Sequence, residues 1–99
     1  MKVLAIGHPR SGVRWEHIAP YVGEEARRVW ELYESDLVRE FYVRADDQPG
    51  VVLVFECEDV TEAERLVAAL PMFEAGLLDF EVIPLRPYMG FRELFRDPT

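Results

Sequence analysis

The alternation of apolar and polar residues is clearest in the middle of the chain, in residues 37–58. Two runs rich in Val, Phe, Tyr and Leu flank residues 46–50, whose sequence is Asp-Asp-Gln-Pro-Gly. Asp, Pro and Gly adopt turn conformations at little steric cost, whereas β-branched and aromatic residues favour strands. The pattern therefore predicts a β-hairpin with a loop of about four residues.

The register of this hairpin decides which side chains share a face of the sheet. Pairing Ala45 with Gly50 predicts one plainly apolar face, made by the pairs Val43–Val52 and Phe41–Val54 and closed by Arg39–Glu56. The opposite face then mixes polar and apolar groups, with Arg44 by Val51, Tyr42 by Leu53, Glu40 by Phe55 and Val38 by Cys57. A slip of one residue regroups all of these neighbours.

The first third of the chain predicts a strand and a helix. Residues 3–6 form a short apolar run that ends at Gly7-His8-Pro9, which is typical of a buried strand leading into a loop. Residues 15–18 can form a single turn, and a helix is expected from Pro20 to about residue 37. Its apolar stripe is Val22, Ala26, Val29, Trp30 and Tyr33, and its solvent face is Glu24, Glu25, Arg27, Arg28 and Glu31.

The last third predicts another helix, a strand and an apolar tail. Asp59 or Thr61 can cap a helix that buries Ala63, Leu66, Val67 and Leu70 and stops at Pro71. Residues 73–76 are expected to be a connection, and the alternation in residues 77–85 predicts a strand with Phe80 and Val82 on one face. Pro84 lacks a ladder donor, which places that strand at an edge or the proline at its end. Phe91, Leu94 and Phe95 give the tail an amphipathic character.

The element order β-α-β-β-α-β predicts a ferredoxin-like α+β domain with both helices on one face of an antiparallel sheet. Residues 51–55 are apolar on both faces, and burying the bare face requires a second layer. We expect one domain over residues 1–99 that forms a homodimer, a dimeric α+β barrel, with residues 88–99 packing on the partner subunit.

Composition narrows the range of partners. The 99 residues carry a net charge of −8, and Lys and Arg form no basic stripe, so neither nucleic acid nor an anionic membrane is an expected partner. Cys57 is the single cysteine, which excludes an intrachain disulfide and fits a reducing compartment. The apolar run near Met1 is too short for a signal peptide or a membrane span, so a cytoplasmic location is expected.

Residues 68–85 resemble the muconolactone delta-isomerase family. The matching features are the Leu70-Pro71 helix stop, the apolar Met72-Phe73 and the strand DFEVIPL of residues 79–85. The resemblance implies a small ferredoxin-like subunit that oligomerises through barrel dimers. The first half differs from the family in residues 7–10 and in the loop with Trp15 and His17, so no catalytic residue is carried over by position.

More broadly, the chain resembles the dimeric α+β barrel superfamily. That group includes cofactor-free monooxygenases of antibiotic biosynthesis, polyketide cyclases, YCII-like proteins and chloromuconolactone dehalogenases. In keeping with this resemblance, no cofactor is expected. The residues agree, because neither a metal-ligand spacing nor a glycine-rich phosphate loop is present.

Two histidines and a polar group in the hairpin are the candidate chemical residues. His8 and His17 have the pKa range that suits proton transfer near neutrality, although each could equally be a solvated or capping residue. Arg44 could bind a carboxylate and Tyr42 could donate to an enolate oxygen, with Glu40 beside them. An ordinary surface ion network is the alternative for these three residues.

An aromatic group surrounds the first helix and the end of the chain: Trp15, Tyr21, Trp30, Tyr33 and Tyr88. Core and dimer packing would explain most of these residues, and a planar aromatic ligand would explain Trp15, Trp30 and Tyr88 as binding residues. Cys57 is expected to be an inert core residue.

Two functions remain open. One is a cofactor-independent isomerase, cyclase or dehalogenase that moves a proton next to a carbonyl of a small lactone or an aromatic or polyketide-derived substrate. It predicts an apolar pocket in which the histidines, Tyr42 and Arg44 converge. The other is a non-catalytic dimeric binding or structural module, for which no ligand-sized cavity and no such convergence are expected.

Overall fold

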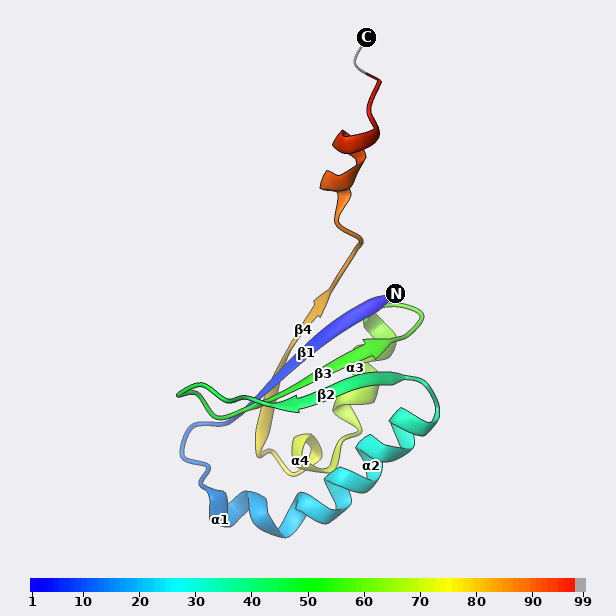
Figure 1. Ribbon diagram of the computed structural model, residues 1–99. Coiled ribbons are helices and arrows are strands. Elements are labelled where there is room, and N and C mark those ends of the chain that lie inside the picture. Colours follow the sequence, from blue (N-terminus) through cyan, green and yellow to red (C-terminus); the bar gives the residue numbers. More distant parts are fainter. Residues whose placement is uncertain (98–99) are drawn as a thin grey trace.

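The computed structural model describes residues 1–97. Four strands and the intervening helices follow the predicted order (Figure 1). The strands are β1 (Lys2–Pro9), β2 (Val38–Val43), β3 (Val51–Glu56) and β4 (Leu78–Pro84). The α-helices are α1 (Trp15–Ile18), α2 (Val22–Glu34), α3 (Val60–Ala68) and α4 (Pro71–Glu74), and the 3₁₀ helices are η1 (Ala19–Tyr21) and η2 (Met89–Phe95).

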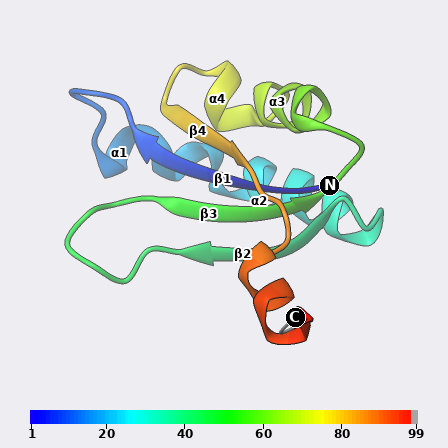
Figure 2. The ribbon, with the colours of Figure 1, turned by 90° about the horizontal axis from the view of Figure 1, so that it is seen from above.

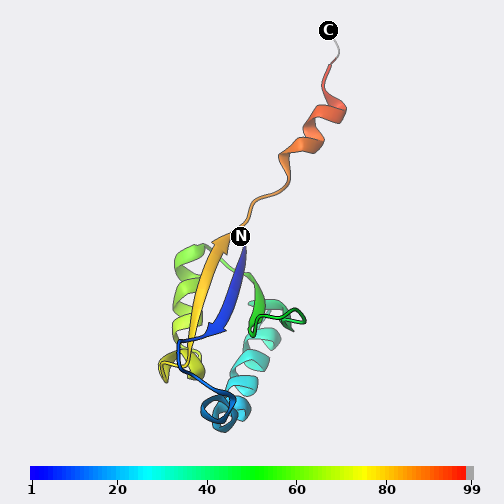
Figure 3. The ribbon, with the colours of Figure 1, turned by 90° about the vertical axis from the view of Figure 1, so that its left-hand side faces the viewer.

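The sheet is antiparallel throughout, with strand order β2-β3-β1-β4. Helices α2, α3 and α4 lie on one face, and the other face carries no layer of its own (Figures 2 and 3). This arrangement is the predicted ferredoxin-like α+β fold. The expected edge position of the last strand is also confirmed, and Pro84 is its final residue.

The core lies between the sheet and the helices. Residues at alternate positions of the strands point to the helices and are fully or almost fully buried, among them Val3, Ala5, Leu53 and Phe55. Gly7 continues the same row in β1, where the ring of Phe80 covers it so closely that an added Cβ would lie 2.6 Å from the ring atoms. The predicted stripe of the second long helix is confirmed, because Ala63, Val67 and Leu70 are buried.

The hairpin register predicted from the sequence is wrong by one residue. Val43 pairs with Val51, Tyr42 with Val52, Phe41 with Leu53 and Glu40 with Val54, and a bulge at Arg39 separates these pairs from Val38–Phe55. The loop is longer than expected, because the strand hydrogen bonds begin with Arg44 N–H donating to Gly50 O at 2.8 Å. Phe41 and Val43 therefore face the helices, while Glu40 and Tyr42 share the open face with Val52 and Val54.

Two further expectations are corrected. The segment predicted as a connection contains α4, because Pro71 does not only end a helix but starts a new one at its first position. Glu25, assigned to the solvent face of the first long helix, is half-buried on its inner side. It lies three residues after Val22 and four before Val29, the spacing that brings residues to one face of a helix.

The open face of the sheet and the end of the chain are the remaining apolar surfaces. Leu4, Ile6, Val52, Val54 and Ile83 are half-buried on the open face. Helix η2 extends away from the body (Figures 1 and 3), and its large apolar side chains are exposed. The predicted tail of residues 88–99 includes two residues, 98 and 99, that lie outside the described part of the chain. Among residues 1–97 no helix is long and apolar enough to cross a membrane.

Candidate functional site

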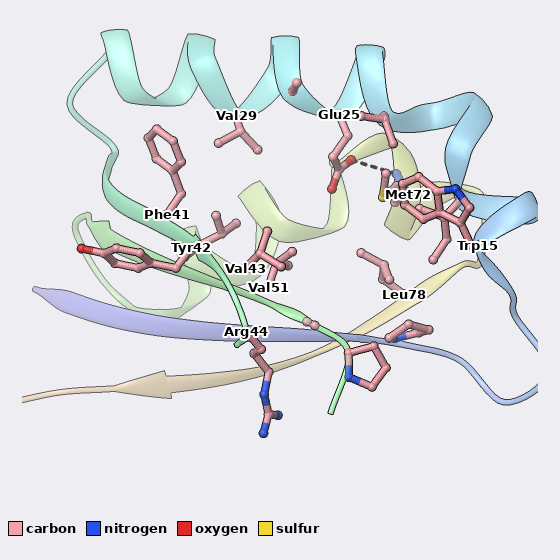
Figure 4. A pocket seen from close by; sticks show the side chains of 18 of the residues that line it. Trp15, Glu25, Val29, Phe41, Tyr42, Val43, Arg44, Val51, Met72 and Leu78 are labelled. Carbon is pink, nitrogen blue, oxygen red and sulfur yellow. Dashed lines mark hydrogen bonds between the residues drawn. The ribbon is translucent and has the colours of Figure 1, made fainter. Parts of the chain in front are cut away.

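A cavity of about 690 Å³ lies between α2 and the helix-facing side of the sheet (Figure 4). Ligand sites in proteins typically measure roughly 300–1,000 Å³. One wall is the stripe of α2, with Val22, Ala26 and Val29. The opposite wall is made by the strand ends and the hairpin, and α4 closes the inner end with Met72; the other lining residues include Gly7, Phe41, Val43, Val51, Leu53 and Leu78.

Glu25 is the polar group that this apolar cavity holds. Its side chain projects from α2 toward α4, where Oε1 accepts a hydrogen bond from the Met72 backbone N–H at 3.0 Å (Figure 4). Burial raises the pKa of the Glu25 carboxyl, and the hydrogen bond from Met72 opposes that rise. A carboxyl whose proton is held more tightly than in water is suited to proton transfer near neutral pH.

The placement of Glu25 has a local structural reason. Met72 is the second residue of α4, so its N–H is one of the donors that a helix start leaves without an intrahelical partner. The Glu25 carboxylate satisfies this donor across 47 residues of sequence. Glu25 is thus both a cap for α4 and a carboxylate at the cavity wall, and the two roles can be separated by substitution.

The tryptophans predicted as ligand contacts do reach this cavity. Trp15 on α1 and Trp30 on α2 both line it, with 70% and 54% of their surfaces exposed at the mouth. Tyr33 connects Trp30 to the hairpin, because its ring lies 5.3 Å from that of Trp30 and 5.6 Å from that of Phe41. Trp15 lies at the end of the cavity opposite to Phe41 (Figure 4). Exposed aromatic side chains, Trp15 and Trp30, therefore border the opening of the cavity, which we call its mouth.

The hairpin candidates lie at the edge of the cavity with their polar ends engaged elsewhere. Tyr42 donates from its hydroxyl to Glu40 Oε1 at 2.7 Å, and this hydrogen bond is the main reason that the Tyr42 pKa is raised. Arg44 pairs with Asp46, with Nε 3.0 Å from Oδ1, and its guanidinium extends away from α2 (Figure 4). The structure thus has two separate surface pairs, Tyr42–Glu40 and Arg44–Asp46, in place of one group that converges on the cavity.

The histidines do not reach the cavity. His8 lies in β1 opposite Asp79, on the open face of the sheet, between the cavity-lining residues Gly7 and Pro9. His17 is exposed on α1, where its Nδ1 accepts a hydrogen bond from the Arg14 N–H at 2.9 Å. Tyr88 lies in the tail, away from the cavity, with its ring 5.0 Å from that of Phe91. The structure does not bring His8, His17, Tyr42 and Arg44 together at one point.

Sequence reasoning missed Glu25, the half-buried carboxylate of the site. The signal was present, because Val22, Glu25 and Val29 recur at helical spacing, but two adjacent glutamates near a helix start are usually both solvated. Among the described residues no group of three His, Cys, Asp or Glu side chains is arranged to hold a metal ion. Cys57 is buried, as expected, and burial raises the pKa of its thiol.

Comparison with known proteins adds information about the fold. No protein-family model matches this chain, and no curated protein sequence matches it. Among solved structures it is similar to 5-chloro-2-hydroxyhydroquinone dehydrochlorinase (TftG) from Burkholderia phenoliruptrix AC1100, in a complex with 2,5-dihydroxybenzoquinone. The likeness has a TM-score of 0.64, 19% sequence identity, and covers 91% of this chain and 98% of that one. At this identity it is the ferredoxin-like α+β fold that the two proteins share.

Proposed function

We propose that this protein is a small cofactor-independent enzyme whose apolar cavity binds a ring-shaped carbonyl compound and whose Glu25 transfers a proton. The observation that carries the proposal is a half-buried carboxyl, with a raised pKa, at the wall of an otherwise apolar cavity. The aromatic rim of Trp15 and Trp30 supplies flat surfaces that suit a planar ring. TftG, which shares the fold, is by name a dehydrochlorinase of a hydroxyhydroquinone.

The chemistry assigned to Glu25 is proton transfer next to a carbonyl. The carboxylate takes a proton from the carbon beside the carbonyl, and the C–H electron pair moves into the ring as an enolate. The carboxylic acid, whose proton exchanges with solvent at the open cavity, then delivers a proton to another carbon of the conjugated system, which completes an isomerisation. Loss of a chloride from the enolate, as an anion, would instead complete an elimination.

The lining favours an uncharged substrate. Arg44, the cation at the cavity, is paired with Asp46 and points outward, while Glu25 contributes negative charge in its ionised form. A substrate carboxylate would be desolvated there without a partner, which is costly. We therefore propose neutral lactones, phenols and quinone-like rings as the first compounds to test.

The test measures exchange of ring protons for deuterium in D₂O by NMR, with the protein and a panel of neutral lactones, cyclohexenones and hydroxyquinones. Catalysed exchange is expected for the wild type. Glu25→Gln keeps an acceptor for the Met72 N–H but cannot take a proton, and it should slow exchange by about 10²- to 10⁴-fold. The matched control is Glu24→Gln, a neighbouring exposed glutamate, which should exchange at the wild-type rate.

Binding is measured separately by thermal shift, because a ligand that binds the native state raises the melting temperature. Glu25→Gln should bind the same rings as the wild type. Binding without any catalysed exchange across the panel would favour the second function, a non-catalytic ligand-binding module. The cavity itself already speaks against an interior filled entirely by its own side chains.

We also propose that the protein is a homodimer joined through the open face of the sheet. No layer formed by residues 1–97 covers the half-buried apolar row on that face. Burying a few hundred Å² of such surface contributes roughly 25 cal/mol per Å².

A further inference from the structure

A second apolar space, which we call the groove, lies between α3, α4 and the edge strand β4. Its volume is about 640 Å³, close to that of the cavity. Strand β4 contributes Phe80 and Val82 to its lining, α4 contributes Phe73, and α3 contributes Val67 and Ala68. The proton transfer assigned to Glu25 makes no use of this groove.

The ring of Phe80 separates the groove from the cavity. Phe80 in β4 is paired with Gly7 in β1; Phe80 lines the groove and Gly7 lines the cavity. The ring atoms Cε1 and Cζ of Phe80 lie 2.6 Å from the point that a Cβ on Gly7 would occupy. The ring therefore rests on the Cα of Gly7, and a side chain at position 7 would take its place.

Helix α4 forms the rest of this partition. Its consecutive residues Met72 and Phe73 line different spaces, Met72 the cavity and Phe73 the groove. The backbone of α4 is held in place, because the Met72 N–H donates to the Glu25 carboxylate at 3.0 Å. Phe80, in contrast, contributes a half-buried side chain. Phe80 is thus the part of the partition whose size can change while the backbone stays where it is.

The cavity has room for a substituent as well as a ring, because its volume is about 690 Å³. At its inner end Met72 and Leu78 are buried apolar side chains, so a substituent that reaches them must itself be apolar. Each further methylene group that is buried there should tighten binding about fourfold. The gain ends where the chain meets a side chain that fills the space.

We propose that Phe80 sets the length of the ligand. The cavity then takes a neutral ring compound with an unbranched alkyl substituent, and the substituent ends where the Phe80 ring covers Gly7. Without that ring, the space above Gly7 would join the cavity to the groove and admit a longer chain. The inference rests on the proposed binding of ring compounds in the cavity, and it holds whether or not Glu25 transfers a proton.

Isothermal titration calorimetry with a series of 4-alkylphenols, from methyl to octyl, measures this limit. For the wild type, the affinity should rise about fourfold per methylene group and then stop rising at one chain length. In Phe80→Ala the rise should continue for about two or more further methylene groups. Phe80→Leu, which keeps more of the packing, should move the limit in the same direction by less.

Phe73→Ala is the matched control, because it removes an aromatic ring from the groove and leaves Phe80 on Gly7. It should keep the wild-type limit. The same limit in the wild type, Phe80→Ala and Phe80→Leu would overturn the inference and leave ring binding in the cavity intact. Failure of the wild type and both Phe80 variants to bind any member of the series would overturn the inference together with the proposed function.

A double-mutant cycle tests the contact between the ring and Gly7 without any ligand. Gly7→Ala places a Cβ where the ring lies, so it should lower the melting temperature by about 5 °C or more. In the Phe80→Ala background the same substitution should cost less than about 2 °C, because the ring that it displaces is gone. Equal losses in the two backgrounds would mean that the ring does not rest on Gly7 in solution and would overturn the proposal.

Discussion

Glu25 shows how one side chain can be a structural cap and a candidate acid at the same time. Its hydrogen bond to the Met72 N–H orients the carboxyl toward the cavity, and the apolar walls there disfavour its ionised form. A charge that is poorly solvated in the folded state costs stability. At the residue scale, the burial that raises the pKa of Glu25 is therefore expected to lower the folding stability when this carboxyl is ionised.

This trade-off predicts a pH dependence of stability. The folded state holds the Glu25 proton to higher pH than the unfolded chain, whose carboxyl has the ordinary pKa of 4.5. Between the two pKa values folding takes up a proton, so this residue's contribution to the free energy of unfolding falls as the pH rises through that window. Glu25→Gln, which stays neutral, should therefore melt above the wild type at pH 7, and the difference should shrink as the pH is lowered toward 4.

Circular dichroism melts between pH 4 and pH 8 measure the effect. Glu24→Gln removes a charge from an exposed position one residue away and should not melt above the wild type at pH 7. A Glu25→Gln protein that melts below the wild type at every pH would mean that the carboxylate form of the cap outweighs the desolvation of its charge.

At the scale of elements, α3 is the helix whose N-terminus is best capped by side-chain hydrogen bonds. Asp59 has extended backbone dihedrals, and its Oδ1 accepts a hydrogen bond from the Glu62 N–H at 2.8 Å. The Glu62 side chain in turn accepts a hydrogen bond from the Glu58 N–H at 2.8 Å. Side chains therefore satisfy two backbone N–H groups at the start of this helix. The choice between Asp59 and Thr61 that the sequence left open is thus decided in favour of Asp59.

Asp59→Ala should lower the free energy of unfolding by about 1 kcal/mol, the usual effect of removing an N-cap side chain. Urea denaturation followed by circular dichroism measures it, with the slope of the transition unchanged. Glu64→Ala, at an exposed position of the same helix, is the control and should change stability by less than about 0.5 kcal/mol. An equal loss in both variants would mean that helix propensity, not capping, sets the stability of α3.

At the scale of the whole molecule, the open face of the sheet and the tail are the apolar surfaces on which the proposed homodimer rests. Val52 lies near the middle of the open face, where it pairs with Ile6 on one side and Tyr42 on the other. An arginine at this position would place a desolvated positive charge in the proposed face-to-face interface, where no carboxylate is positioned to pair with it. The same side chain on the open face of a monomer would simply extend into water.

Val52→Arg should therefore prevent the proposed homodimer from forming and leave a folded monomer. Sedimentation velocity gives the mass, and circular dichroism shows whether the fold is kept. The same exchange in the loop before α1, Val13→Arg, should leave the dimer intact. A Val52→Arg protein that sediments like the wild type would show that the copies do not associate through this face.

Several features could be read from the sequence because they are local. A last strand with Pro84 at its end, a cap at Asp59 or Thr61 and the buried stripe of α3 follow from residue types at short spacing, and the structure selects Asp59 as the cap. The hairpin register could not be obtained in this way. The longer loop moves the pairs of residues 40–43 by one position, and the bulge at Arg39 moves Val38 by one more. Neither shift follows from residue types at short spacing alone.

The candidate site could likewise be predicted from the sequence only in part. For Trp15 and Trp30 the aromatic content left packing and ligand binding open, and the structure places both side chains at the cavity. His8 alternates to the opposite face because Gly7 and not its neighbour takes the inner position in β1. Glu25 was assigned to solvent because its partner, Met72, is 47 residues away. A contact of that separation leaves no periodic signal in either segment.

By itself, the sequence determined the order of the elements and hence the ferredoxin-like α+β fold, because strand alternation, helical stripes and turn residues are short-range patterns. It also determined that the sheet has a face with apolar residues and no helix to cover it. Only the tertiary structure decided which groups meet at the cavity, because α2, α4 and the hairpin approach one another through packing of the core. That packing desolvates Glu25, separates it from the histidines and leaves the aromatic mouth open at the end of the sheet opposite to the tail.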